Sequence, residues 1–189
     1  MPVQTLDAHR SALRQFGDRV AQVRDDQWGA PTPDPGWTVR DLVGHLTGEQ
    51  LWVPELLAGR TVREIGDRFS GDVLGDDPVA AWTAAATAAR AAWTEPGALD
   101  RTVQLSAGPT PALDYLQEMT LDLAVHAWDL ARAIGATEDM PNDLVSEVLD
   151  LARRIVPRYA DAGIFAAALD VASCTDDLTE LLALTGRRR

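Results

Sequence analysis

TVRDLVGHLTGEQLW, residues 38–52, and LDLAVHAWDLARA, residues 121–133, share the pattern that decides the fold of this chain of 189 residues. In both stretches apolar residues recur three and four positions apart, which is typical of a helix with one buried face. Three further segments, 6–23, 78–93 and 141–155, repeat the pattern, and almost no segment alternates as a strand would. The sequence therefore predicts an all-α protein, a helix bundle with additional short helices.

Helix boundaries follow from capping signals. Thr38 with Asp41, and Thr61 with Glu64, have the spacing of capping boxes. A proline after a capping residue starts a helix at residues 77–78, and Gly135 ends the helix that starts near residues 110–111. Residues 96–111 form a connection that is long enough to cross the bundle, with one short strand at 102–105. The predicted helices are 6–23, 39–58, 61–69, 78–93, 111–134, 141–155 and 178–184.

Composition excludes several classes of function. The net charge of −12 and the pI near 4.5 disfavour nucleic-acid and membrane-surface partners, because an acidic surface repels phosphates. All 17 basic residues are arginine, so lysine Schiff-base chemistry is excluded. The lone Cys174 excludes an internal disulfide, and we interpret it as structural or incidental and not as a nucleophile. Without a signal peptide or a membrane-spanning run, we expect one cytoplasmic domain over residues 1–189.

Two histidines and an aspartate form the strongest candidate site. Asp122 and His126 are four residues apart, so they share one helix face, and His45 lies beside the apolar stripe of an earlier helix. If these helices are neighbours, the three side chains converge, and two imidazoles with one carboxylate are a common ligand set for zinc or non-haem iron. Ordinary hydrogen-bonded histidines and a helix-surface Asp–His pair are the alternative that the residues alone leave open.

Other residues near these positions have more than one possible role. Glu49, one turn after His45, is either a replacement ligand, a general base, or a partly exposed helix carboxylate. Trp52, Tyr115 and Met119 either line a substrate pocket or belong to the core. His9, the remaining histidine, lies near a helix start, and we interpret it as structural.

GWTVRDLVGHL, GEQLWVPELLAGR, LDLAVHAWDLARAIG and LLALTGR together resemble the actinobacterial metal-binding proteins related to mycothiol-dependent maleylpyruvate isomerase. The resemblance extends from about Trp37 to the C-terminal LLALTGR and implies a DinB-like four-helix bundle. It also implies that His45, Asp122 and His126 bind a divalent metal, usually zinc, with Ni2+ and Fe2+ as alternatives. Asp122 stands where the isomerase has glutamate, and the isomerase has a further C-terminal domain that we do not expect in this chain.

The resemblance implies a metal-dependent transferase that adds a low-molecular-weight thiol, mycothiol, to a small-molecule electrophile. Two alternatives stay open, a metal-dependent hydrolase that uses the same three ligands and a bundle that binds metal without catalysis. A homodimer through an exposed bundle face is also open. We expect the isomerase reaction itself to be weak or absent, because it depends on the further domain.

Overall fold

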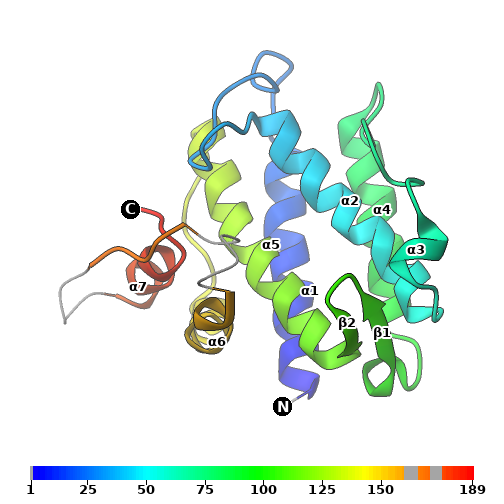
Figure 1. Cartoon of the computed structure of the whole chain (residues 1–189). Coiled ribbons are helices and arrows are strands. Elements are labelled where there is room, and N and C mark those ends of the chain that lie inside the picture. The colour runs from blue at the N-terminus through cyan, green and yellow to red at the C-terminus, as the bar shows by residue number, and fades with distance from the viewer. Residues whose placement is uncertain (1, 160–165, 171–175) are drawn as a thin grey trace.

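Four long helices form the bundle in this computed structural model, which describes residues 2–159, 166–170 and 176–189. They are α1 (Pro2–Val20), α2 (Val39–Leu57), α4 (Pro78–Trp93) and α5 (Ala112–Ile134). Helix α1 packs against α5 and α4, and α2 packs against α4 and α5 (Figure 1). The all-α bundle predicted from the apolar periodicity is confirmed.

The predicted caps form the expected hydrogen bonds. Thr38 Oγ1 accepts from the Asp41 backbone N–H while the Asp41 carboxylate accepts from the Thr38 N–H, which completes a capping box at the start of α2. Thr61 and Glu64 form a second box at the start of the short helix α3 (Val62–Ile65). Helix α5 ends at Gly135, whose φ of 70° is the left-handed conformation that glycine favours at a C-terminus. Helix α1 ends at Val20, three residues before the predicted end.

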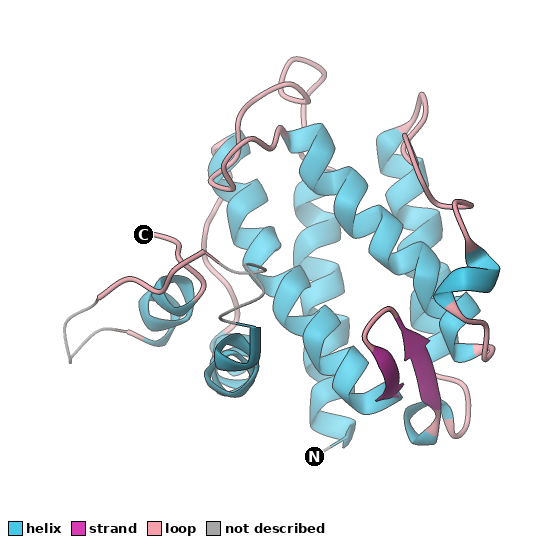
Figure 2. Cartoon of the chain, in the orientation of Figure 1, coloured by secondary structure: helices cyan, strands magenta, loops and turns pink. Residues whose placement is uncertain are grey.

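The connection between α4 and α5 contains more strand than the sequence predicts. After a short 3-10 helix, η1 (Ala98–Asp100), strands β1 (Thr102–Leu105) and β2 (Gly108–Pro111) pair as an antiparallel hairpin (Figure 2). Strand β1 is confirmed, whereas β2 was not predicted because GPTP carries two prolines. Proline is compatible with an edge strand, where no ladder hydrogen bond needs its missing N–H. The hairpin lies against α2 and the start of α5.

The remaining helices pack beside the bundle. Helix α6 (Asn142–Ile155) contacts α5 and α1 and continues into η2 (Val156–Tyr159), and α7 (Asp177–Leu184) packs on α6. Their apolar residues extend the main core cluster of α1, α2 and α5. A second cluster joins the ends of α2 and α4 to the hairpin and the start of α5. In the described part of the chain, no helix is long and apolar enough to cross a bilayer.

Candidate metal centre

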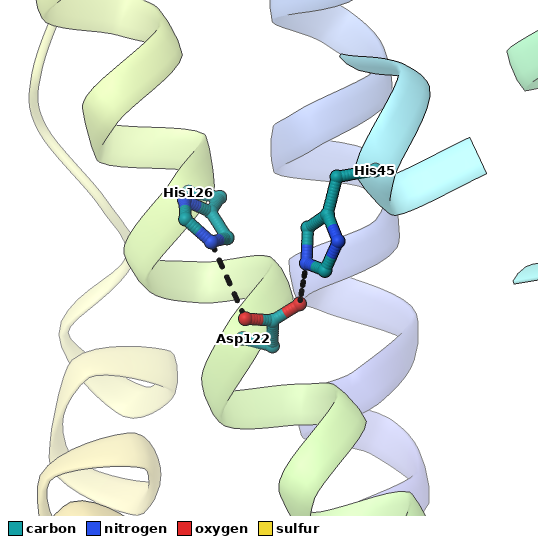
Figure 3. Close-up of side chains that lie close together, drawn as sticks. All are labelled: His45, Asp122 and His126. Carbon is teal, nitrogen blue, oxygen red and sulfur yellow. Dashed lines mark hydrogen bonds and ion pairs between the residues drawn. The ribbon is translucent and has the colours of Figure 1, made fainter. Parts of the chain in front are cut away.

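His45, Asp122 and His126 converge between α2 and α5, as Figure 3 shows. The Asp122 carboxylate lies between the two rings: Oδ2 is 3.2 Å from His45 Nε2, and Oδ1 is 3.3 Å from His126 Nε2. One potential ligand atom from each residue lies within 4.8 Å of the others. Two imidazole nitrogens and a carboxylate at this separation fit a divalent metal with open coordination positions.

Local structure explains this convergence. The capping box fixes the start of α2, and seven residues beyond Thr38 the helix presents His45 toward α5. On α5 the separation of four residues places Asp122 and His126 on one face. The side chains of His45 and Asp122 are each about one-third exposed, whereas His126 is 7% exposed. The site therefore has a buried side at His126 and an open side at His45.

A second carboxylate orients His126. Its Nδ1–H donates to Asp129 Oδ2 over 2.9 Å, and Asp129 is fully buried on the same helix. Arg187, from the segment after α7, donates to Asp129 over 2.9 Å and to Asp34 over 3.0 Å. Metal-ligating histidines commonly donate their second ring N–H to a carboxylate in this way, which fixes the orientation of the ring. Asp34, His126 and Asp129 also lie close enough for a metal, but Arg187 already pairs with both carboxylates.

Electrostatics favour a charged cluster. Burial by itself would lower the pKa of His126, but the charge and hydrogen bonding of Asp122 and Asp129 outweigh burial and raise that pKa to about 9. Burial also opposes ionisation of Asp122, yet His126 and His45 hold the pKa of its carboxyl far below the usual range. The pKa of His45 is raised because the interaction with Asp122 exceeds the effect of burial. Protons on the two imidazoles therefore compete with a metal for the same nitrogens.

Trp37 covers the two imidazoles. Its ring stacks on His126 at a centroid distance of 5.8 Å and an interplanar angle of 16°, and it meets the edge of His45 at 5.0 Å. Trp37 lies one residue before the cap of α2, so the same short segment starts the helix and covers the site. An aromatic cover limits the motion of both rings and reduces the access of water to them.

The open side of the triad faces a cavity of about 580 Å³. Helix α2 contributes His45, Glu49, Trp52 and Leu56 to its wall. The rest of the wall comes from α3, the hairpin turn, α5 and the end of α6. Its lining residues there are Val62, Leu105, Ser106, Ala107, Tyr115, Glu118, Met119, Leu121, Asp122, Ile155 and Tyr159. The volume is within the range of small-molecule sites.

The other residues singled out from the sequence divide between cavity and core. Glu49 is half-buried on the cavity wall, and its pKa is raised, first by burial and then by the charge of Asp122. Tyr115 and Met119 are only 5% and 4% exposed, so they belong to the core and line the cavity at once. His9 is buried in α1 with its Nδ1 3.1 Å from Thr120 Oγ1, and it does not belong to the triad. Cys174 lies outside the described residues.

Sequence reasoning missed the residues behind His126. Asp129 is three positions after His126 on the same helix, so the HAWD spacing contained a usable signal. Arg187 ends the LLALTGR segment, yet nothing in its spacing indicated a contact with α5. Trp37 and Glu118 were also not assigned to the site, although Glu118 lies directly before the candidate Met119 in the sequence.

Comparisons with known proteins agree with this geometry. The family model described as mycothiol maleylpyruvate isomerase N-terminal domain matches residues 9–131. Uncharacterized proteins MT0763 and Rv0738 of Mycobacterium tuberculosis, strains CDC 1551 and H37Rv, are each 35% identical over 159 residues, which cover 84% of this chain and 83% of theirs.

Two crystal structures share the fold. They are the mycothiol-dependent maleylpyruvate isomerase and a histidine-to-alanine variant of it, with TM-scores of 0.66 and 0.67 and sequence identities of 20% and 18%. Each match covers 93% of this chain and 78% of the other, and at these identities the likeness establishes the DinB-like fold alone. On the family match and the mycobacterial relatives together, the chain belongs to the mycothiol maleylpyruvate isomerase N-terminal domain family.

Proposed function

We propose that this protein binds one divalent metal through His45, Asp122 and His126 and uses it to transfer a low-molecular-weight thiol to a small electrophile. The observation that carries the proposal is that His45 and Asp122 of the triad line one end of a cavity of about 580 Å³, with His126 buried behind Asp122. Membership of a family named for a mycothiol-dependent enzyme supports mycothiol as the thiol. Zinc suits two imidazoles, a carboxylate and a sulfur ligand, and Ni2+ and Fe2+ are compatible with the same donors.

A bound divalent metal supplies a Lewis acid that favours the deprotonated form of a thiol. The protein's own residues would do the remaining work. Asp129 holds the His126 ring in place, so that Nε2 points toward Asp122. Trp37 stacks on His126 and meets the edge of His45, which would limit the motion of both rings. Both effects would preorganise the site before a substrate enters.

Glu49 is the proposed proton acceptor. Its carboxylate lines the same cavity as Asp122, and burial with the charge of Asp122 raises its pKa. A raised pKa makes a carboxylate a better base toward a thiol, because the ideal catalytic pKa approaches the working pH. The thiol proton would pass to Glu49 while the sulfur forms its bond to the electrophilic carbon. The electron pair of the bond broken at that carbon, either a π bond or the bond to a leaving group, would move to the neighbouring atom or depart with the leaving group, which then takes the proton from Glu49. Trp52, Tyr115 and Met119 would hold the apolar part of that electrophile.

Hydrolysis on the same residues is the second candidate, because Glu49 could equally take a proton from water. The two candidates differ in their need for an added thiol. A third candidate, metal binding without catalysis, predicts metal content but no turnover with any thiol or electrophile. We favour thiol transfer on the family match, and we propose that the protein acts in the cytoplasm as a single domain.

The deciding experiment incubates zinc-loaded protein with mycothiol and a panel of small electrophiles and follows S-conjugate formation by mass spectrometry. We expect conjugation that requires the thiol and the metal, is lost in His126→Ala and falls in Glu49→Gln. Cys174→Ser serves as the matched control, because the sulfur comes from outside the chain. Conjugation that persists without metal or disappears in Cys174→Ser would overturn the proposal, and turnover without any thiol would favour hydrolysis.

A further inference from the structure

The cavity wall is acidic beyond the triad, and this determines which electrophiles it accepts. We propose that the site takes uncharged or amine-bearing electrophiles and excludes molecules that carry a carboxylate. The inference rests on the proposed function and specifies the substrate class of that same site. It is argued from the charges on the wall, their partners and the aromatic rings between them.

Three carboxylates line the cavity: Glu49 from α2, and Glu118 and Asp122 from one face of α5. Glu118 and Asp122 are four residues apart, so their charges extend along the cavity from the triad toward Tyr159. Among the described lining residues there is no arginine. The two undescribed ranges, 160–165 and 171–175, contain no arginine or lysine in the sequence, so neither can supply a cation.

Of the two cavity-lining carboxylates on α5, Glu118 is the one outside the triad, and no arginine pairs with it among the described residues. Its Oε1 accepts a hydrogen bond of 2.6 Å from the hydroxyl of Tyr159, a neutral donor. Among the described residues, Glu118 and Glu49 form no ion pair with an arginine, whereas nearby Glu55 pairs with both Arg60 and Arg68. Arg40 lines an adjoining pocket that shares His45, Glu49 and Trp52 with the cavity, but Arg40 does not line the cavity itself and pairs with Asp72. The charged side chains that line the cavity are therefore carboxylates.

A bound divalent metal does not make the net charge around the cavity positive. Three carboxylates outnumber the two positive charges that such an ion brings, and the positive Arg187 is already paired with Asp129 and Asp34. Two like charges about 6 Å apart repel by roughly 3 kcal/mol at the effective dielectric constant of partly buried sites, a factor on the order of one hundred in affinity. An anionic substrate therefore meets repulsion along the cavity, while an ammonium group meets attraction.

Aromatic rings suit the same class of ligand. Trp52, Tyr115 and Tyr159 line the cavity among the carboxylates. The faces of such rings attract cations and pack against uncharged apolar groups. Maleylpyruvate, the substrate named in the family's description, is a keto diacid and is anionic at neutral pH. A site for it needs cationic partners, and the described lining of this cavity offers none besides the triad.

Binding of matched probes tests the inference without requiring catalysis. Benzylamine, benzyl alcohol and benzoate have the same ring and differ in charge, and their affinities for zinc-loaded protein are measured by isothermal titration calorimetry at pH 7. We expect benzylamine to bind tightest, benzyl alcohol next, and benzoate at least ~10-fold more weakly than the alcohol. Glu118→Gln keeps a hydrogen-bond acceptor for Tyr159 and removes one charge, so it should narrow the gap between amine and benzoate several-fold.

Asp25→Asn is the matched control. Asp25 is exposed and does not line the cavity, and its substitution removes the same charge from the chain as Glu118→Gln does. Benzoate binding as tight as the amine, an equal change in Asp25→Asn and Glu118→Gln, or no binding of any probe would overturn the inference. None of these results depends on thiol turnover. If S-conjugates form but benzoate binds more tightly than benzylamine, the inferred substrate class is wrong and the proposed thiol transfer stands. If the probes bind in the expected order but no S-conjugate forms, the proposed thiol transfer is wrong and the inferred charge preference stands.

Discussion

The imidazole of His126 donates from Nδ1 to the buried carboxylate of Asp129 over 2.9 Å, so its Nε2 faces Asp122. This pairing determines which nitrogen of His126 is available to a metal. Arg187 in turn holds Asp129 from the C-terminal segment. Arg187, 58 positions after Asp129 in the sequence, thus contributes to the orientation of the proposed ligand His126.

Asp129→Asn should weaken metal binding. The amide is a poorer acceptor for the His126 N–H, and losing such a partner typically costs 10- to 100-fold in metal affinity. Competition with a chromophoric chelator measures the affinity, and circular dichroism confirms that the variant is folded. Asp150→Asn, an exposed change on α6, is the control. An unchanged affinity in Asp129→Asn would show that the pairing does not support the site.

Metal binding should strengthen as pH rises. The pKa of His126 is raised to about 9 by Asp122 and Asp129 against the opposing effect of burial, so at pH 7 a metal must displace its proton. Calorimetry in buffers of different ionisation enthalpy should detect release of at least one proton per metal. An affinity that is constant between pH 6 and pH 9 would contradict this competition.

The raised pKa of His126 should make the metal-free protein less stable as pH rises, whereas metal binding becomes stronger. A histidine whose pKa is higher in the folded state stabilises the fold fully below about 6.5 and loses that contribution as pH rises through about 9. The melting temperature of metal-free protein should therefore decline over this window. The difference in melting temperature between the metal-bound and metal-free forms should widen, which differential scanning calorimetry can follow. A difference in melting temperature that narrows as pH rises would contradict the raised pKa of His126.

His9 should make the protein sensitive to acid. Burial lowers its pKa to about 3, so below about 6.5 the unfolded chain binds a proton that the folded chain does not. The stability that the neutral imidazole provides is complete above pH 6.5 and is lost as pH falls toward 3. The asparagine of His9→Asn cannot be protonated. Between pH 7 and pH 5 the free energy of unfolding of this variant should therefore fall by ~2 kcal/mol less than that of the natural protein, at ~1.4 kcal/mol per pH unit. Urea unfolding at both pH values measures this, and equal losses would contradict it.

Removing the metal should leave the bundle folded. The two hydrophobic clusters involve every long helix and contain none of the three proposed ligands. A metal that binds only the folded state stabilises it by ~4 kcal/mol at a thousandfold excess over Kd. Chelator should therefore lower the melting temperature by several degrees without loss of helical circular dichroism. Complete unfolding in chelator would mean that the site is structural.

The sequence was sufficient for the helices, and it predicted convergence of the triad on the condition that the two helices are neighbours, which the structure supplies. Capping at Thr38 and Thr61 is local chemistry, and the apolar stripes beside His45 and His126 already required both helices to face the core. The hairpin was harder, because the prolines of β2 argue against a strand except at an edge. Contacts that join distant segments, such as Arg187 with Asp129 and Tyr159 with Glu118, depend on the packing of α6 and α7 and have no periodic signal.

Glu49 shows where spacing alone could not decide. One turn after His45, a carboxylate can face solvent or the site, and both positions are compatible with the sequence pattern. The structure places it half-buried on the cavity wall, because α2 turns that face toward α5. Its function as a base stays a prediction, which the Glu49→Gln variant tests through turnover at unchanged metal content.

The most direct test of the account is the metal content of purified protein and of three single variants, measured by inductively coupled plasma mass spectrometry after dialysis. The account predicts close to one divalent metal per chain in the natural protein and almost none in His45→Ala, Asp122→Ala and His126→Ala, with His9→Asn unchanged. Full metal content in His45→Ala, whose position is 77 residues from Asp122, would contradict convergence of the two helices on one ion. Natural protein that holds no metal after growth with zinc would contradict the central claim itself.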